Sequence, residues 1–453
     1  MPGVRLTIPG RVSATKYENA RRGTRTRKSP RHPEGASNVS DTPKRAQWGA
    51  QAHLDERGKL PVSFPRILGP NAMAYLQEVA DSGLTADMTG RFEREFAEAL
   101  GVKHCIATPG CTPALHVLAL ACGWAPGDEI IVSPVTDYGT LHGFVAQNII
   151  PVFPDTAPGS INFSPETIES CITDRTRGIL CVHMTGLIND MDGINALAAR
   201  HGLLVIEDAC QAVFGEYRGR FAGTLGHVAG FSFDAEKTMG SDIGGCMVTN
   251  DDALAEQARY LGQSRGAVMK PHYGRLHADA GYAYRMPQCT AALCLAQLEI
   301  IREQVAHRDR IIRMLYGLLG DMPGITPLRI PNDNTVYSCW MAGFNIEPAA
   351  FACSTEEFAA QLADAGIPGA GMGRYYLMPE AVTYLARNAG AKVYPYSMPP
   401  ASRAYSYAIE QYPNAVAFLD TFIRWSTFCE KYQPEHCELA AAIVREVADK
   451  NRV

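Results

Sequence analysis

The sequence has no long hydrophobic run, no Cys-x-x-Cys pair and no excess of positive charge. No stretch approaches the ~20 apolar residues that a membrane helix needs, and the N-terminus lacks an apolar signal core. The 13 cysteines are scattered, so we expect reduced thiols and neither a disulfide framework nor a metal site. The net charge of −5 excludes a globally basic nucleic-acid binder. We therefore expect a cytoplasmic protein with no membrane segment and no nucleic-acid partner.

The composition indicates a globular chain with an unusual N-terminal segment. With 453 residues, 46% of them hydrophobic and 20% charged, the chain can bury a sizeable core in two or three domains, or in one large domain with a smaller partner. Residues 1–50 instead hold eleven Lys and Arg residues against three acidic ones. We predict a basic flexible tail over residues 1–60. The alternative is a tail that contacts nucleic acid or another anionic surface.

Short apolar runs alternate with helical patterns from residue 61 onward. Runs without polar alternation are typical of strands covered on both faces, and strands alternating with helices indicate an α/β fold with a mainly parallel sheet. We predict a large domain over residues 61–325, in which 61–85 are candidates for packing on a smaller domain. The seven predicted strands are 104–107, 129–133, 150–153, 178–182, 203–206, 228–233 and 246–249. The predicted helices include 89–100, 113–122, 165–172, 193–201 and 253–261.

A smaller α+β domain is predicted over residues 326–453. A long helical stretch over 287–319 precedes it, and a strand-like pattern follows over 336–346. Ser354 and Glu357 then have the spacing of a capping box, which is typical of a helix start. A last helix is predicted to begin near Pro434.

Residues 108–115 join a predicted strand to an apolar helix. Thr112 suits the N-cap of that helix and Pro113 suits its first position. A helix start at the end of a parallel strand offers free N–H groups and a positive dipole end to an anion. The segment therefore predicts a phosphate cradle, and the alternative is an ordinary strand-to-helix turn.

Two further segments place polar side chains at the ends of predicted strands, where ligands bind in open α/β sheets. Glu207 and Asp208 end one strand, and a carboxylate there can pair with a cation such as a protonated pyridine nitrogen, or can cap a helix. Ser232 and Lys237 follow another strand. The glycine pair at 244–245 then leads into the next strand, which indicates a hairpin.

Lys237 is the most informative of these residues. Lysines are seldom buried without a role, desolvation lowers the pKa of a lysine, and a neutral amine can form a Schiff base. A lone lysine is more often a solvated surface group. Here, however, a phosphate cradle, Asp208, Ser232 and Lys237 follow in the order expected of a pyridoxal phosphate (PLP) site, in which the protein supplies binding, orientation and a partner for the pyridinium.

The same segments resemble the DegT/StrS-type sugar aminotransferases, which are PLP enzymes of the aspartate-aminotransferase fold. The resemblance covers most of residues 64–453. It is carried by residues 84–96, 151–155, 183–186, 190–192, 207–212, 231–237, 281–286 and 291–298. It implies PLP fold type I, an α/β class with a large domain around a mainly parallel seven-stranded sheet and a smaller α+β C-terminal domain.

The resemblance also implies roles for individual residues. Lys237 would bind PLP as a Schiff base and move the proton between the cofactor carbon and the substrate carbon. Asp208 would pair with the pyridine nitrogen, and Gln211 would lie near the 3-hydroxyl of the ring. The phosphate would be held by Ser232, Thr112 and the backbone of Cys111. Because a partner subunit completes the site in this family, a homodimer with shared active sites is implied.

Four positions depart from the family pattern. Cys111 stands where the family usually has Gly. The family's ring-stacking aromatic aligns with Asp137, so either Tyr138, one place on, stacks on the ring or the stacking is lost. The Asn that reaches the partner's phosphate aligns with Ala283, and the acidic residue before Gly-Gly aligns with Ile243. These changes indicate a divergent branch and leave the substrate more open than the cofactor.

Three residues are weaker candidates for substrate binding. His183 ends a predicted strand and would contact ligand there, or else is a satisfied core histidine. Arg374 and Tyr375 follow a Gly-rich stretch. Arg374 would offer a guanidinium to a substrate carboxylate or phosphate. The alternative is a surface loop with packing aromatic residues. Trp340 is expected in the core.

The resemblance implies an aminotransferase that moves an amino group from glutamate or glutamine to a keto-sugar or cyclitol, as in amino-sugar, polysaccharide or secondary-metabolite biosynthesis. Lys237 would act as acid and base in both half-reactions. One alternative is a sugar dehydratase on the same scaffold, but that branch typically carries His in place of the lysine. The other is a PLP-binding regulatory protein without catalysis. The departures at Asp137, Ala283 and Ile243 favour it, whereas the retained Asp208, Ser232 and Lys237 argue against it.

Overall fold

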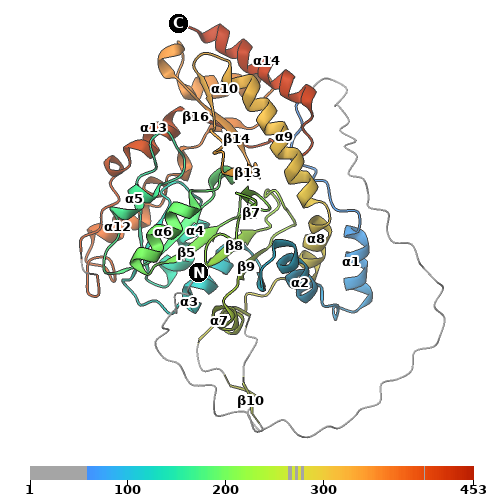
Figure 1. Ribbon diagram of the computed structural model, residues 1–453, viewed down its shortest axis with the longest axis vertical. Helices are drawn as coiled ribbons and strands as arrows, with labels where there is room; N and C mark the ends of the chain where they lie inside the picture. Colours follow the sequence, from blue (N-terminus) through green and yellow to red (C-terminus); the bar gives the residue numbers. More distant parts are fainter. Residues whose placement is uncertain (1–58, 264–267, 271–273, 277–279, 402) are drawn as a thin grey trace, which may run out of the picture. The chain divides into compact units, whose positions relative to one another are not determined.

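The computed structural model describes residues 59–263, 268–270, 274–276, 280–401 and 403–453 (Figure 1). The predicted basic tail lies outside these residues up to position 58. Leu60, at the end of that predicted tail, is already buried, so the globular core begins there. No helix in the described ranges is long and apolar enough to cross a membrane.

A seven-stranded sheet lies at the centre of the predicted large domain. Its strand order is β1-β9-β8-β5-β4-β2-β3, and β9 runs antiparallel between β1 and β8, while β8, β5, β4, β2 and β3 pair in parallel. The strands are β1 (His104–Thr108), β2 (Glu129–Val132), β3 (Ile150–Val152), β4 (Thr176–Val182), β5 (Leu204–Asp208), β8 (Val228–Ser232) and β9 (Gly245–Thr249). All seven predicted strands and their mainly parallel arrangement are thereby confirmed.

Both faces of this sheet are buried. Successive side chains of a strand point to opposite faces, and on β2 Ile130 and Val132 belong to one hydrophobic cluster while Ile131 belongs to another. The helices α3 (Cys111–Ala121), α4 (Gly139–Ala146) and α7 (Asp252–Gln263) contribute to the first cluster, which continues into the C-terminal part. The second cluster is supplied by α1 (Ala72–Asp81), α2 (Met88–Leu100), α5 (Pro165–Glu169), α6 (Met191–His201) and α8 (Gln288–Leu298).

Side-chain caps and left-handed glycines define the ends of several helices. The Asp87 carboxylate accepts a hydrogen bond from the backbone N–H of Gly90 at the start of α2. Gly101 ends that helix with φ of +76°, a value that glycine adopts without strain. Asp190 and Gly202 bound α6 in the same way. The helix α5 ends at Glu169 and is therefore three residues shorter than the predicted helix 165–172.

The C-terminal part is built on a four-stranded antiparallel sheet of order β12-β14-β16-β15. Its strands are β12 (Ile325–Pro327), β14 (Ala342–Ile346), β15 (Ala370–Met372) and β16 (Phe422–Trp425). Its helices are α9 (Ile301–Gly320), α10 (Thr355–Ala365), α11 (Met378–Ala381), α12 (Thr383–Gly390), α13 (Pro413–Thr421) and α14 (Pro434–Asn451). The predicted capping box at Ser354 and Glu357 opens α10, and the last helix begins at Pro434, as predicted.

Two shorter sheets complete the fold, and two predicted elements are corrected. The short sheets comprise β6 (Glu216–Tyr217), β7 (Arg220–Phe221) and β13 (Asn334–Val336) in one, and β10 (Val268–Lys270) and β11 (Gly274–Leu276) in the other. The helical stretch 287–319 breaks at Glu299 and Ile300, because α8 packs on α1 and α2 whereas α9 packs on α14. The strand-like stretch 336–346 divides into β13 and β14, which belong to different sheets.

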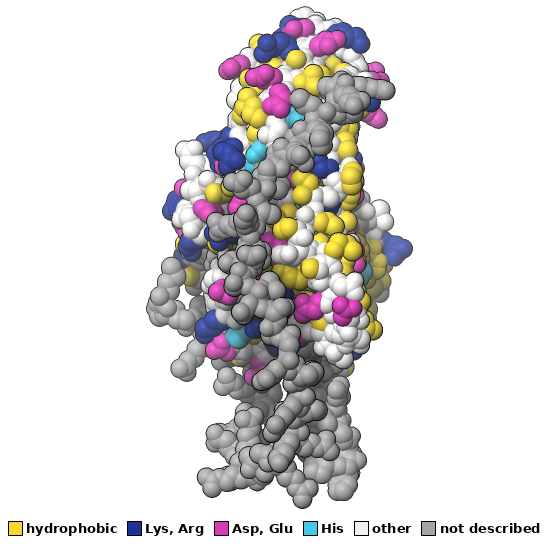
Figure 2. Space-filling model, turned by 90° about the vertical axis from the view of Figure 1, so that its right-hand side faces the viewer, with side chains coloured by type: hydrophobic (Ala, Val, Ile, Leu, Met, Phe, Trp, Pro, Cys, Tyr) yellow, Lys and Arg dark blue, Asp and Glu magenta, His cyan; other side chains and the backbone are white. Residues whose placement is uncertain are grey.

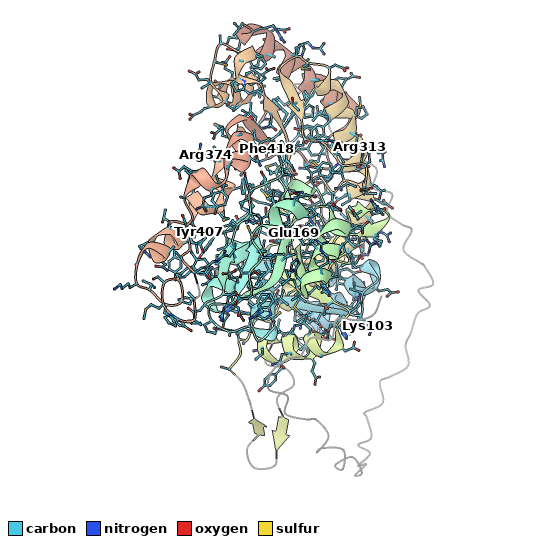
Figure 3. The ribbon with its side chains drawn as sticks, turned by 60° about the vertical axis from the view of Figure 1, so that its left-hand side comes forward. Lys103, Glu169, Arg313, Arg374, Tyr407 and Phe418 are labelled. Atoms are coloured by element: carbon cyan, nitrogen blue, oxygen red, sulfur yellow. The ribbon has the colours of Figure 1, made fainter. Side chains whose placement is uncertain are left out.

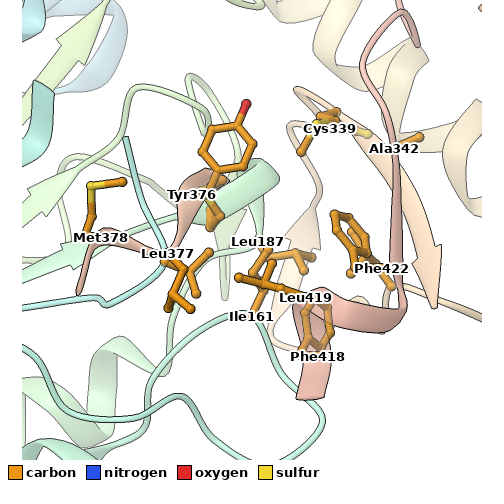
Figure 4. Close-up of a cluster of buried hydrophobic side chains, with 14 of the residues drawn as sticks. Ile161, Leu187, Cys339, Ala342, Tyr376, Leu377, Met378, Phe418, Leu419 and Phe422 are labelled. Atoms are coloured by element: carbon orange, nitrogen blue, oxygen red, sulfur yellow. The ribbon is translucent and has the colours of Figure 1, made fainter. Parts of the chain in front are cut away.

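Hydrophobic burial joins the C-terminal part to the region of the central sheet. Ile161 and Leu187 lie in one buried cluster with Leu377, Phe418 and Leu419 (Figure 4). The N-terminal residues of the globular region also contact the C-terminal part, since the Lys431 ammonium donates to the carbonyl of Val62 at 2.9 Å. The domain boundary at residue 325 therefore stays a prediction, because the buried cluster spans both sides of it.

Hydrophobic side chains also gather on the face of the molecule that carries α1 (Figure 2). Phe64 and Leu68 are each about half exposed, and Met73 on α1 is 74% exposed.

An aromatic cluster beneath the central sheet generates the first testable prediction. The ring of Phe96 is fully buried and lies 5.3 Å from the rings of Phe92, Phe231 and Phe233. We expect Phe96→Ala to lower the free energy of unfolding by about 3–5 kcal/mol, measured by urea denaturation. Glu98→Ala, which removes an exposed side chain from the same helix α2, should change it by less than about 0.5 kcal/mol. Equal effects of the two substitutions would contradict this assignment of the core.

Candidate active site

A cavity of about 560 Å³ opens at the carboxyl ends of the central strands. Val182, Asp208 and Ser232, which end β4, β5 and β8, all line it. The first turn of α3 lines the same cavity, and so does Lys237. The structure therefore brings together the three segments that the sequence singled out, at the edge of the sheet where ligands bind in open α/β folds.

The start of α3 forms one wall of this cavity. The helix begins at Cys111 with Gly110 as its N-cap, which corrects the prediction that Thr112 caps it and Pro113 comes first. The backbone N–H groups of Cys111 and Thr112 therefore belong to the first turn, where N–H groups have no intrahelical acceptor. A helix start of this kind binds anions.

Gly245 on β9 holds this helix start close to β8. In the antiparallel ladders Gly245 is the register partner of both Thr108 and Ser232. A Cβ atom on Gly245 would lie 2.3 Å from the carbonyl carbon of Gly110 and 2.4 Å from the backbone nitrogen of Cys111. Only glycine permits this approach of β9 to the helix start.

Asp208 is the buried carboxylate of the site, 5% exposed. Its Oδ2 accepts a hydrogen bond from the hydroxyl of Thr140 at 2.7 Å, and its Oδ1 accepts one from the backbone N–H of Cys210 at 3.2 Å. The Thr140 hydroxyl also lies 2.7 Å from that of Thr136. These contacts fix the orientation of the carboxylate in the cavity wall.

Gln211 follows Asp208 by three residues and also lines the cavity. Its side-chain oxygen accepts a hydrogen bond of 2.6 Å from the backbone N–H of Thr185. Thr185 has a positive φ of 59°, an uncommon conformation for a residue with a side chain. Because the oxygen of Gln211 is occupied, its amide NH₂ is the group available to a ligand.

Lys237 extends into the cavity beside Trp340. Its ammonium lies 4.4 Å from the centre of the Trp340 ring, a cation–π contact. The indole N–H of Trp340 donates to the carbonyl of Glu236 at 2.9 Å, and its backbone N–H donates to that of Thr185 at 3.0 Å. Trp340 packs against the core but is not fully buried, which corrects the expectation that it belongs to the core alone.

Two thiols lie beside Asp208 in the cavity wall. The side chains of Cys111 and Cys210 are hydrogen-bonded to each other. That bond lowers the pKa of the Cys111 thiol, but burial and the negative charge of Asp208 together raise the pKa above its ordinary value. Burial raises the pKa of Cys210 well above its ordinary value. Both groups are therefore protonated thiols at neutral pH.

Tyr138 lies away from the cavity wall. Asp137, which aligns with the family's stacking aromatic, lines the cavity, whereas Tyr138 is outside the residues that line it. The Tyr138 ring is 41% exposed, and its hydroxyl lies 2.6 Å from Nδ1 of His142. Among the other departures, Ile243 lines the cavity with half of its surface exposed, and Ala283 is exposed.

The structure places two of the weaker substrate candidates, His183 and Arg374, outside the cavity lining. His183 is fully buried, and its Nε2 lies 3.0 Å from Glu207, which favours the core interpretation. Arg374, labelled in Figure 3, donates to Asp420 at 2.6 Å and to Glu380 at 2.9 Å. Its charge is thus already paired. The side chain of Tyr375 lies outside what the structure describes.

Thr136, Thr140 and Tyr376 are among the cavity-lining residues that sequence reasoning missed. Tyr376 comes from the C-terminal part, where its carbonyl accepts a hydrogen bond of 2.9 Å from the backbone N–H of Thr136. Val135 and Leu377 form a β-bridge beside it. No local motif marks these residues, because they reach the site only through contacts between distant segments.

Comparisons with known proteins agree with this geometry. Residues 67–410 match the model of the DegT/DnrJ/EryC1/StrS aminotransferase family. GDP-perosamine synthase of Caulobacter vibrioides is 40% identical over 263 residues, 57% of this chain and 70% of that protein. A spore coat polysaccharide biosynthesis protein of Bacillus subtilis is 34% identical over 280 residues, 59% of this chain and 71% of that protein.

A solved structure extends the comparison to the fold. The structure of 3-amino-5-hydroxybenzoic acid synthase superposes with a TM-score of 0.74 at 25% identity, and covers 86% of this chain and 99% of that one. Fold and site together define an aminotransferase of PLP fold type I. Within that class, the chain belongs to the DegT/DnrJ/EryC1/StrS aminotransferase family.

The close approach at Gly245 generates the second prediction. Gly245→Ala should displace the start of α3 and weaken the binding of a phosphate ester at this helix by about tenfold or more, which corresponds to at least about 1.4 kcal/mol. The measurement is a titration with PLP, followed by absorbance. Gly317→Ala is the matched control, because a Cβ there meets nothing within 4 Å. Equal affinity in the two variants would contradict the assignment of the cradle.

Proposed function

We propose that this protein is a PLP-dependent aminotransferase that moves an amino group from glutamate or glutamine to a keto-sugar or cyclitol. The observation that carries the proposal is the convergence of Lys237, Asp208 and the start of α3 on one cavity. These are a nucleophilic amine, a buried carboxylate and an anion site. The start of α3 at Cys111 precedes Asp208 by 97 residues and Lys237 by 126 residues in the chain.

The residues of the cavity fit PLP. The N–H groups at the start of α3 and the hydroxyl of Ser232 offer donors to a phosphate, and Gly245 lets β9 approach the helix start closely. Asp208 offers a carboxylate that two hydrogen bonds already orient, as a partner for the pyridine nitrogen. When bound, the cofactor supplies an electron sink for the carbon that carries the amino group.

The residues of this chain then have separate tasks. Lys237 would hold the cofactor through Nζ and, once released from it, move a proton to and from the substrate carbon. Asp208 would keep the proton on the pyridine nitrogen. Gln211 would donate from its amide NH₂ to the ring oxygen, because its own oxygen is bound to Thr185. Trp340 would limit the positions that the Lys237 amine can take.

The acceptor class is supported by the relatives. One is named for the synthesis of GDP-perosamine and another for a spore coat polysaccharide. We propose that this chain likewise acts on a keto-sugar or cyclitol, with a nucleotide-linked sugar as one form. The departures at Asp137 and Ile243, both in the cavity lining, are the positions at which we expect its acceptor to differ from those of its relatives.

We also propose a cytoplasmic homodimer. The exposed apolar side chains of Phe64, Leu68 and Met73 offer a surface for a second copy. Ile243 lines the cavity while half exposed, so a partner that covers it would also enclose the site. The 13 cysteines are all free, which supports a reducing compartment. Light scattering on the purified chain tests the dimer.

The visible spectrum tests the proposed reaction. We expect purified protein loaded with PLP to show a yellow absorbance band that bleaches on addition of L-glutamate or L-glutamine. Bleaching reports removal of the amino group from the donor in the first half-reaction. A band that responds to neither amino acid would contradict the proposed donors, and a protein that cannot be loaded with PLP would contradict the proposed function.

The third prediction concerns the effect of replacing Lys237. Lys237→Ala should abolish turnover while the thermal unfolding temperature stays close to that of the wild type, because the side chain lies in the cavity. Lys103→Ala is the matched control: Lys103, labelled in Figure 3, is largely exposed and pairs with Asp252 at 3.4 Å. That variant should keep normal turnover. Wild-type turnover by Lys237→Ala would refute the mechanism.

A further inference from the structure

Cys111, Cys210 and Asp208 form a cluster of potential metal ligands. One sulfur from each cysteine and one carboxylate oxygen all lie within 4.8 Å of one another. Within the described ranges, this is the one group of three such side chains at that spacing. The cysteine spacing in the sequence predicts no metal site, because no two cysteines stand at a Cys-x-x-Cys spacing. The fold creates this cluster instead, by placing the start of α3 beside the end of β5.

The spacing of the three donor atoms is near that of ligands around one tetrahedral ion. Zn–S bonds of about 2.3 Å and Zn–O bonds of about 2.0–2.2 Å put neighbouring ligand atoms about 3.4–3.8 Å apart. Donors that already lie within 4.8 Å therefore reach those positions through small side-chain rotations. Two sulfurs and one oxygen leave the fourth position to water from the cavity, which both cysteines line.

The surroundings of the three donors are already ordered. Thr140 and the backbone N–H of Cys210 hold the Asp208 carboxylate, in the manner of the outer hydrogen bonds that orient metal ligands. Gly230 makes room for the sulfur of Cys111, since a Cβ on that glycine would lie 3.0 Å from it. Both Cys111 and Asp208 are less than 10% exposed.

The charges also balance within the cavity. Two thiolates and one carboxylate carry three negative charges, against two positive charges on the ion. Lys237 contributes a further positive charge that acts on both thiols. Binding releases the two thiol protons to solvent, since only the thiolate is a good ligand.

We propose that Cys111, Cys210 and Asp208 bind a thiophilic divalent cation, Zn²⁺ or Cd²⁺, and that the ion and PLP exclude each other. The exclusion follows because both require the same Asp208 carboxylate, and this second part rests on the proposed function. Cys111 is the decisive residue, because it supplies a sulfur at a position where the family usually has glycine. The site would make cofactor loading sensitive to free soft metal ions.

The ion itself tests the site. Cd²⁺ is titrated into protein that is freed of PLP and kept reduced with a phosphine. We expect thiolate-to-metal absorption, and we expect the wild type to bind one more Cd²⁺ ion per chain than the Cys111→Gly or Cys210→Ala variant. Cys111→Gly and Cys210→Ala should each weaken this binding at least tenfold. Cys289→Ser, which removes an exposed thiol, should leave it unchanged. Thermal unfolding checks that each variant is folded.

Competition tests the second part. Zn²⁺ should slow or prevent PLP loading of the wild type, a chelator should restore it, and Cys111→Gly should load normally in the same Zn²⁺ concentration. Equal Cd²⁺ binding by the wild type and both cysteine variants would overturn the site. Ion binding without any effect on PLP loading would overturn the exclusion. Because Cd²⁺ binding is read without PLP, failure of the proposed function would be seen separately.

Discussion

The site depends on the position of one residue without a side chain. Gly245 pairs with Thr108 on one side and with Ser232 on the other, so a single rung of the sheet aligns the segment that enters α3 with the end of β8. Its backbone also touches Gly110 and Cys111. The helix start and the serine are therefore held in register by strand pairing, and the flexible loops around them do not set their separation.

A second constraint separates the tasks of two adjacent acids. Successive residues of β5 point to opposite faces, so Glu207 and Asp208 meet different surroundings. Glu207 accepts hydrogen bonds of 2.6–2.7 Å from three backbone N–H groups, those of Gly223, Leu225 and Gly226. Its negative charge is satisfied inside the protein, and Asp208 alone turns toward the cavity.

Features that depend on neighbouring residues in the sequence were predictable, and features that depend on contacts between distant segments were not. The seven strands were predictable because burial on both faces leaves an apolar run that is visible locally. Lys237, Asp208 and Ser232 were placed in one cavity because each follows a recognisable strand. Trp340 and Thr140 were not placed in the cavity. Trp340 lies between β13 and β14 and Thr140 lies on α4, and neither segment has a sequence motif that indicates a site. The pair of Cys111 and Cys210 lies about a hundred residues apart, beyond any spacing rule.

The bridge between Val135 and Leu377 has a consequence for the order of events during synthesis. Residues 108–245 supply most of the cavity, but Trp340 and Tyr376 complete its wall, and the carbonyl of Tyr376 holds the N–H of Thr136. On the ribosome, the central sheet emerges well before these residues. A nascent chain that has formed its sheet thus still lacks part of the pocket wall, and the wall is complete only after Tyr376 has left the exit tunnel.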